Sequence, residues 1–297
     1  MSAAAADDEA PWRRMASAYA ESWLAMFGLG LLVICLGLAL AAPWISPQNP
    51  YALAQLDIMD SSLPPGSEAS AGFRFLLGSD DQGRDMVSAI LYGLRISVAV
   101  GAAATGIALV VGLAFGLIAA YAGGRIDGAI MRIVDIQLSF PAILIALILI
   151  AVLGNGIGKI IFALVTVQWA YYARTVRASA MVERRKDYVE AARGLGLSSW
   201  RILFRHMLPN CLAPVIVIAT VQMAHAIALE ATLSFLGLGL PVTEPSLGLL
   251  ISNGFQYVLS GKYWISMFPG VALLVTIVAI NLVGDRLREV LNPRGPQ

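Results

Sequence analysis

The sequence predicts an all-helical integral membrane protein with six transmembrane helices. Of its 297 residues, 58% are hydrophobic and 13% are charged, whereas soluble domains carry about 25% charged residues. About 20 residues in helical conformation cross a ~30 Å hydrocarbon core. Six predominantly apolar stretches are expected to form or begin the spans, and they cover residues 22–42, 96–124, 136–153, 160–173, 211–229 and 263–284.

The N-terminal part is expected to be a polar tail over 1–21 followed by a first transmembrane helix over 22–45. The tripeptide Ala39-Leu40-Ala41 is similar to a signal-peptidase site, so a cleaved signal peptide is the alternative. The apolar run before it is longer than the ~7–15 residues of a signal peptide. A retained anchor is therefore favoured.

The segment 46–92 is rich in Pro, Asp and Ser and is expected to be a loop outside the membrane. The remaining five helices form a core over 93–290, which leaves a C-terminal tail over 291–297. Within the core we expect a short polar turn at 125–132. Pro141 is expected to kink the third span.

Two further features of the core concern helix length. The fourth helix is expected to continue past the bilayer through Arg174, Arg177 and Glu183, because no helix-breaking residue interrupts it. The Gly-, Pro- and aromatic-rich segment 234–269 contains an apolar run at 247–259. That run is too short to cross the membrane and fits an interfacial or re-entrant helix.

Basic residues are distributed unevenly between the two sides that six spans define. Six spans place both termini on the same side, and fifteen of the twenty Lys and Arg residues fall on that side. By the positive-inside rule this side is the cytoplasm. The expected partners then include membrane lipid, and the basic cluster from Arg174 to Arg205 needs no nucleic acid to explain it.

The sequence contains little that indicates catalysis or metal binding. Its two cysteines are far apart and its two histidines have no metal-ligand spacing. The acidic residues Asp80, Asp81 and Asp85 lack the spacing of a calcium loop. We expect a turn in which Asp and Arg pair locally, no metal site and no catalytic residue.

Ionisable residues within spans would indicate an ion or proton pathway. Asp135 follows Arg132 by one turn and is expected to pair with it at the membrane interface. Glu230 lies roughly 29 Å beyond Cys211 at helical rise, which places it near the outer surface. His225 is expected to form a hydrogen bond inside the bundle, and a role of His225 or Glu230 in the pathway or an outer gate is the alternative.

The longest polar interruption of the second half, residues 187–210, has the pattern of two short amphipathic helices. Tyr188, Ala191, Ala192 and Leu195 share one face of the first helix. Gly194 and Gly196 allow the chain to turn with positive φ. The second helix is expected to be capped by Ser198 or Ser199 and to end at Pro209. It carries an apolar stripe on one side and basic residues on the opposite side. The stripe is Trp200, Leu203, Phe204 and Met207, and the basic residues are Arg201 and Arg205.

The same stretch resembles the coupling (EAA) loop of ABC-importer permeases. The resemblance rests on Glu190-Ala191-Ala192, Gly196 after three further residues, and Leu208-Pro209 at the end. The usual pattern has Ile where His206 stands, a departure typical of the peptide/nickel branch. Four other stretches resemble the second, C-type permease of that branch, namely LLGSDDQGRD, MRIVDIQLSFP, EATLSFLGLG and NLVGDRLREVLNPR.

The resemblance implies a type I ABC-importer permease fold in a bacterial inner membrane, with both termini cytoplasmic. It also implies a second homologous permease, one or two cytoplasmic ABC ATPase subunits and an extracytoplasmic substrate-binding protein. ATP and Mg²⁺ would bind to the ATPases, and this chain would bind no cofactor. A coupling loop over 183–210 would dock into an ATPase through Tyr188, Glu190, Ala191, Ala192, Gly196, Trp200, Arg201, Leu203, Phe204, Arg205, His206 and Pro209.

A stand-alone secondary transporter or channel is the main alternative. It predicts midplane ionisable residues, pairs of broken helices or inverted repeats, and none is evident in the sequence. An intramembrane enzyme would need a clustered nucleophile or metal set. The sequence leaves the substrate open between dipeptides, longer peptides, glutathione, nickel chelates and opine-like compounds.

Overall fold

The structure is a computed structural model and describes residues 11–291 except 53, 55, 242 and 245. These residues form helices joined by loops, with two isolated β-bridges and no strand. Of the expected tails, 1–10 and 292–297 lie outside the described residues, whereas the rest of the expected N-terminal tail is mostly helical and forms α1. The helices are α1 (Pro11–Ala20), α2 (Trp23–Ile45), η2 (Ile58–Asp60), α3 (Met86–Ala122), α4 (Gly124–Leu138), α5 (Ala142–Leu153), α6 (Ile157–Glu183), α7 (Asp187–Gly194), α8 (Ser199–Arg201), η3 (Ile202–Met207), α9 (Leu208–Phe235), α10 (Leu247–Phe255), η4 (Val258–Ser260) and α11 (Trp264–Leu291).

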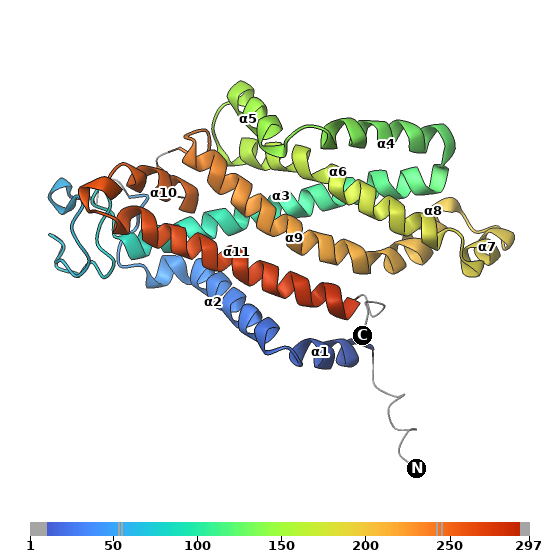
Figure 1. Cartoon of the computed structure of the whole chain (residues 1–297), viewed down its shortest axis with the longest axis horizontal. Helices are drawn as coiled ribbons and strands as arrows, with labels where there is room; N and C mark the ends of the chain where they lie inside the picture. The colour runs from blue at the N-terminus through green and yellow to red at the C-terminus, as the bar shows by residue number, and fades with distance from the viewer. Residues whose placement is uncertain (1–10, 53, 55, 242, 245, 292–297) are drawn as a thin grey trace, which may run out of the picture.

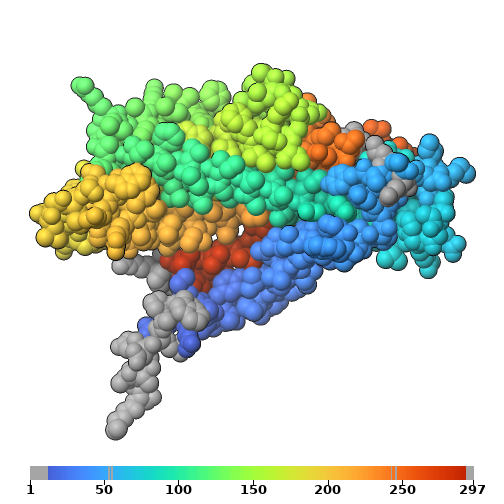
Figure 2. Space-filling model, turned by 180° about the vertical axis from the view of Figure 1, so that it is seen from behind, coloured from blue at the N-terminus to red at the C-terminus, as the bar shows by residue number. Residues whose placement is uncertain are grey.

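The bundle is elongated and its two ends differ in structure (Figure 1). One end carries α7 and α8, and the other carries α10 and the loop 46–85. The helix α1 and the last turns of α11 lie in the half that contains α7. From behind, α2 crosses the edge of the bundle and the segment 187–207, here called the hairpin, protrudes at one end (Figure 2).

The long helix α3 packs along α6 because small residues let the two backbones approach. A Cβ atom on Gly112 would lie 2.3 Å from the Tyr172 Cβ, and one on Gly116 would lie 2.7 Å from the Ala173 carbonyl oxygen. The two glycines are four residues apart and face the same way. Small residues of this kind are common where membrane helices pack closely.

Four helical segments are long and apolar enough to cross a membrane, or five if α4 and α5 together form one span. They are α2, α3, α11 and the continuous stretch Ser199–Phe235. The helix α6 has 27 residues but is not among them, and its middle carries polar residues such as Gln168 and Arg174. Six spans therefore stay a prediction, with α6 as the sixth.

The expected third span, 136–153, is not one kinked helix. The helices α4 and α5 meet at an angle of 88°, with Ser139, Phe140 and Pro141 between them. The proline ring disfavours helical conformation at the residue before it, so the helix ends there. Pro141 thus breaks the segment instead of kinking it.

The stretch 125–132, expected as a short polar turn, is helical and belongs to α4. Its acidic residue pairs with α6: the Arg177 guanidinium contacts the Asp127 carboxylate at 2.5 Å. The Arg174 guanidinium likewise contacts the Asp135 carboxylate at 2.5 Å. The expected pairing of Asp135 with Arg132 is therefore wrong, because α4 lies beside the polar end of α6.

At the other end, the acidic turn before α3 is bonded locally, as expected. The Asp80 carboxylate accepts backbone N–H bonds from Gln82 and Arg84, both at 2.8 Å. Asp85 caps α3 by accepting the Ser88 N–H at 2.7 Å. Because of this cap, α3 begins at Met86, earlier than the expected end of the loop at residue 92.

Candidate functional site

The turn between α7 and α8 has the geometry that the glycine pattern predicts. Gly196 has φ +73°, a left-handed conformation that residues with a side chain adopt at a cost. A Cβ atom at Gly196 would meet no other atom within 4 Å, and the same is true of Gly194. The turn is therefore fixed by backbone conformation and not by packing.

The second helix of the hairpin does not end at Pro209. It continues through a π-helical turn, Ile202–Met207, into α9, where the Leu208 N–H donates to the Leu203 carbonyl oxygen. Pro209 then lies in the first turn of α9, where a missing N–H costs little. The stop expected from Pro209 is wrong, because the wider turn accommodates the proline. Ser198 occupies the N-cap position without a side-chain bond.

The inner face of the hairpin packs against the bundle. Val189 is fully buried and Ala192 is 5% exposed, while Ile202 and Met207 are 1% and 0% exposed. They contact the apolar ends of α3 and α6. Of these, only Ala192 and Met207 belong to the predicted stripes, so Val189 and Ile202 are contact residues that the helical pattern missed.

The outer face of the hairpin exposes large apolar side chains. Leu195 and Trp200 are 80% and 71% exposed, and Phe204 is 41% exposed. The rings of Trp200 and Phe204 are in contact, with centroids 4.0 Å apart. The basic residues Arg201 and Arg205 are also exposed. We call these five residues the docking face.

The other predicted coupling residues are distributed around this face. Glu190, Ala191 and Pro209 are exposed, whereas Leu203 and His206 are partly buried. The predicted stripe thus separates into outward aromatic residues and the inward Met207, because the π-helical turn changes the helical register. The structure brings the predicted hairpin residues together on one protrusion.

A hydrogen-bonded network ties the base of the hairpin to α6 and α9. The Tyr188 hydroxyl donates to the Glu183 carboxylate at 2.6 Å, and the Lys186 ammonium contacts the same carboxylate at 2.6 Å. The Asn210 amide donates to the His206 carbonyl oxygen at 2.7 Å. Burial and the neighbouring Glu183 raise the pKa of Tyr188 to about 12, so the phenol keeps its proton at neutral pH.

A second set of contacts ties the hairpin to α3. The Tyr121 hydroxyl donates to the Ser199 hydroxyl at 2.7 Å, and the Arg193 guanidinium lies 5.5 Å from the Tyr121 ring centroid. The Arg184 guanidinium donates to the Ala120 carbonyl oxygen at 2.8 Å. The hairpin and its base therefore contact α3, α6 and α9.

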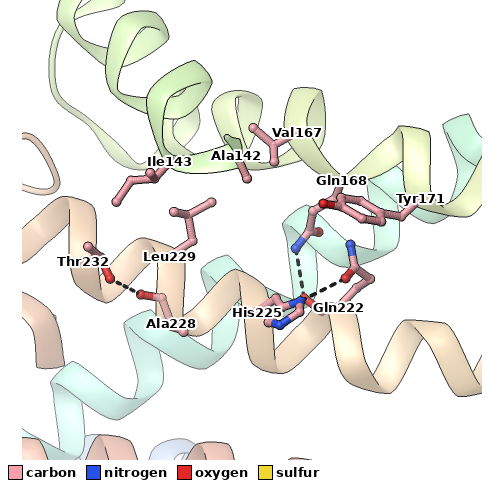
Figure 3. A pocket seen from close by; sticks show the side chains of 10 residues that line it. All are labelled: Ala142, Ile143, Val167, Gln168, Tyr171, Gln222, His225, Ala228, Leu229 and Thr232. Atoms are coloured by element: carbon pink, nitrogen blue, oxygen red, sulfur yellow. Dashed lines mark hydrogen bonds between the residues drawn. The ribbon is translucent and has the colours of Figure 1, made fainter. Parts of the chain in front are cut away.

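The two predicted pathway residues lie away from the hairpin. Glu230 is fully buried and accepts hydrogen bonds from Ser97 on α3 at 2.9 Å and from Ser234 at 2.7 Å. His225 forms the expected hydrogen bond inside the bundle, with the Gln222 side chain at 3.1 Å. It lines a pocket between α5, α6 and α9 (Figure 3). Gln168 and Gln222 also line this pocket. Neither residue is among the predicted pathway residues.

The arrangement offers a surface for a partner and a polar pocket, and we find no cluster of metal ligands among the described residues. The base of the hairpin contacts α6 and α9, and both of these helices also line the pocket.

Comparison with known protein families gives two matches along the chain. Residues 10–65 match the N-terminal TM domain of oligopeptide transport permease C. Residues 112–295 match the binding-protein-dependent transport system inner membrane component. The second match alone covers more than half of the chain.

Proteins of similar sequence include two that are named as peptide permeases. A dipeptide transport system permease protein DppC from Escherichia coli is 42% identical over 91% of this chain and 89% of its own length. A di/tripeptide transport system permease protein DppC from Pseudomonas aeruginosa is 36% identical over 96% and 92%. Among solved structures, an inward-facing MetNI methionine ABC transporter chain has 22% identity and a TM-score of 0.56. This match covers 68% of this chain and 96% of that one, and it supports the fold alone.

Proposed function

The chain belongs to the family of inner-membrane components of binding-protein-dependent transport systems and is an ABC-transporter permease subunit; from this premise we propose that it forms, with a second homologous permease, an ATP-driven passage for short peptides. The names of its relatives from Escherichia coli and Pseudomonas aeruginosa support dipeptides and tripeptides as substrates. It is a multi-pass inner-membrane protein. In the proposed topology α6 is the sixth span, and the termini and the hairpin face the cytoplasm.

The docking face carries this proposal. Leu195, Trp200 and Phe204 are exposed at the tip of a helical protrusion, with Arg201 and Arg205 beside them. Apolar anchors bordered by charges are typical of specific protein interfaces. The proposed occupant is the apolar cleft of a cytoplasmic ABC ATPase, which would hold the ATP and Mg²⁺. One or two such subunits would serve the permease pair.

Coupling follows from the contacts at the base of the hairpin. When the two ATPases close on ATP, the docked hairpins of the two permeases move with them. The bonds from Tyr188 to Glu183 and from Tyr121 to Ser199 transmit this movement to α6 and α3. Switching a carrier from 1:99 to 99:1 requires about 5.5 kcal/mol of differential binding, which tight ATP binding at two sites can supply.

The opposite end would receive the substrate-binding protein. The segments 46–92 and 234–269 contain the loop, α10 and the surroundings of Glu230, and they lie at the end away from the hairpin (Figure 1). In this arrangement Glu230 contributes to an outer gate and His225 to the passage.

The turn glycine provides a test of coupling with a matched control. We expect Gly196→Val to leave the protein inserted, because its side chain would meet open space. Its left-handed backbone would be strained by roughly 1–2 kcal/mol, which reorients the docking face and uncouples peptide uptake from ATP hydrolysis. Both activities are measured in vesicles containing the complete transporter.

Gly194→Val is the control, because Gly194 also faces open space but its φ is not left-handed. It should leave uptake and hydrolysis close to the wild type. Normal coupled uptake by Gly196→Val would show that the hairpin is not the coupling element. Peptide uptake without any ATPase would instead support a stand-alone transporter.

A further inference from the structure

A pocket of about 420 Å³ lies between α5, α6 and α9. This volume is within the range of small-molecule sites, about 300–1,000 Å³. Its wall is apolar on the α5 side and polar where α6 and α9 face each other (Figure 3). No Asp, Glu, Lys or Arg lines it. Its polar lining residues are Gln168, Tyr171, Gln222, His225 and Thr232.

The pocket lies near the middle of the two helices that supply these polar groups. At 1.5 Å per residue, Gln168 is roughly 16 Å from the start of α6 and roughly 22 Å from its end. Gln222 is roughly 20 Å from either end of α9. The polar groups therefore lie at the depth of the hydrocarbon core, if both helices cross the membrane as proposed.

The hydrogen bonds among these residues leave acceptors without a partner. The Gln168 amide donates to the Gln222 backbone carbonyl at 2.9 Å. Its own side-chain oxygen has no hydrogen-bond partner, although Gln168 is only 3% exposed. The His225 Nδ1 lies 3.1 Å from the Gln222 side-chain oxygen, which can only accept. His225 must therefore donate from Nδ1, and the Nε2 of the neutral ring is an acceptor.

Lipid chains cannot satisfy such acceptors. A buried polar group without a partner costs about 1–3 kcal/mol, and polar residues in membrane helices usually face the interior or a water-filled cavity. The pocket is also much larger than one water molecule, which occupies about 30 Å³. N–H or O–H donors of a molecule in the pocket would satisfy these acceptors.

We propose that this pocket is the part of the solute passage that this chain supplies, with Gln168 and His225 accepting hydrogen bonds from the amide or ammonium N–H groups of a passing peptide. The proposal rests on the proposed function and names where the peptide makes contact. The apolar wall from α5 accommodates peptide side chains. Because no fixed charge lines the pocket, the peptide is held weakly enough to leave again, as a conduit requires.

Water access provides the first test. In a chain with Cys35 and Cys211 replaced by Ala, a single His225→Cys substitution is exposed to a charged, membrane-impermeant methanethiosulfonate reagent in the complete transporter. We expect labelling during ATP turnover, and slower labelling when dipeptide is added. The control is Val33→Cys on α2, because the Val33 side chain is apolar and 60% exposed at the edge of the bundle. If the thiol introduced by His225→Cys reacts no faster than the thiol introduced by Val33→Cys, the pocket is not part of an aqueous passage.

Uptake provides the second test. Gln168→Leu removes the unpartnered acceptor, and we expect dipeptide uptake per inserted transporter to fall roughly three- to tenfold. Thr175→Val on the same helix should have little effect, because its hydroxyl donates to the Tyr171 carbonyl within the helix and lies outside the pocket. The amount of inserted protein is measured in parallel, so a folding defect is separated from a transport defect.

The outcomes distinguish the two proposals. If the wild-type transporter takes up dipeptide with ATP but Gln168→Leu transports at the wild-type rate, the passage assignment is wrong and the proposed function stands. If the wild type shows no ATP-dependent peptide uptake, the proposed function itself fails.

Discussion

The two ends of the molecule are built in opposite ways. At the α10 end, the two glycines of α10 have no room for a side chain: a Cβ on Gly248 would lie 2.4 Å from the Ala231 carbonyl oxygen, and one on Gly254 would lie 2.5 Å from the Ile265 backbone. The charged residues Arg84 and Glu230 there are fully buried. At the hairpin, Gly196 has open space around it and the largest aromatic side chains face outward.

This difference indicates which end holds its shape by itself. The α10 end packs its backbone closely and bonds Glu230 and Asp85 to neighbouring serine residues within the chain. The hairpin is fixed at its base by hydrogen bonds, but its outer face has no contact within the described residues that covers Leu195 or Trp200. The first end is thus covered by its own chain, whereas the second leaves apolar side chains exposed, which fits the proposed docking of an ATPase.

The largest expected effect concerns packing at the α10 end. Gly248→Val places a side chain within 3 Å of the α9 backbone, and overpacking of this kind should destabilise the protein by about 3 kcal/mol or more. The thermal unfolding midpoint of the detergent-purified protein checks this. The same substitution at Gly196 should lower that midpoint less, because the added side chain meets open space and costs only the roughly 1–2 kcal/mol of left-handed backbone strain. Equal midpoints for the two variants would contradict the contrast between the ends.

An intermediate effect is expected at the hairpin. Trp200→Ala should weaken ATPase binding by about 2 kcal/mol, or roughly thirtyfold, without altering thermal unfolding. The affinity is measured between the purified permease pair and its ATPase. Leu259→Ala is the control, because Leu259 is also an exposed apolar residue, at 99% exposure, but lies at the α10 end, opposite the hairpin. Equal affinities for wild type and Trp200→Ala would show that the docking face is not part of the interface with the ATPase.

The smallest expected effect is a pH dependence confined to the loop 46–85. Burial raises the pKa of Asp80 to about 6, against the lowering effects of the Arg84 N–H bond and charge, and Asp81 adds to the increase. The folded loop binds this proton more tightly than the unfolded loop. Its contribution to stability is complete below about pH 4 and is lost as the pH rises through about 6.

Hydrogen exchange of the loop amides, corrected for intrinsic rates, should therefore show greater protection at pH 5 than at pH 7.5, by about 1 kcal/mol. Asp80→Asn should abolish the difference. The hairpin gives an internal comparison, because Tyr188 has a pKa of about 12 and its bond to Glu183 is unaffected by Tyr188 ionisation in this range. Greater protection at pH 7.5 would contradict the assignment to Asp80.

Local sequence patterns predicted much of the fold and part of the site. The positive φ of Gly196, the continuation of α6 to Glu183 and the short helix at 247–255 follow from residue type and helical period. These features depend on residues within one or two turns of each other.

Features that depend on another helix were missed or mistaken. Asp135 pairs with Arg174, 39 positions away, and Glu230 is bonded to Ser97, 133 positions away. Pro209 lies within a continuous helix because a π-helical turn precedes it. Gln168 gives no signal in a hydropathy pattern beyond making α6 more polar.

The sequence by itself determined that this is a helical membrane protein with several segments apolar enough to cross, and where the amphipathic hairpin turns. Those properties come from hydropathy and backbone preference, which neighbouring residues set. Only the tertiary structure decided which charges pair, which aromatic residues of the hairpin face outward, and that Gln168 and His225 share one pocket. Such relations arise when helices distant in sequence pack together and bury one another's polar groups.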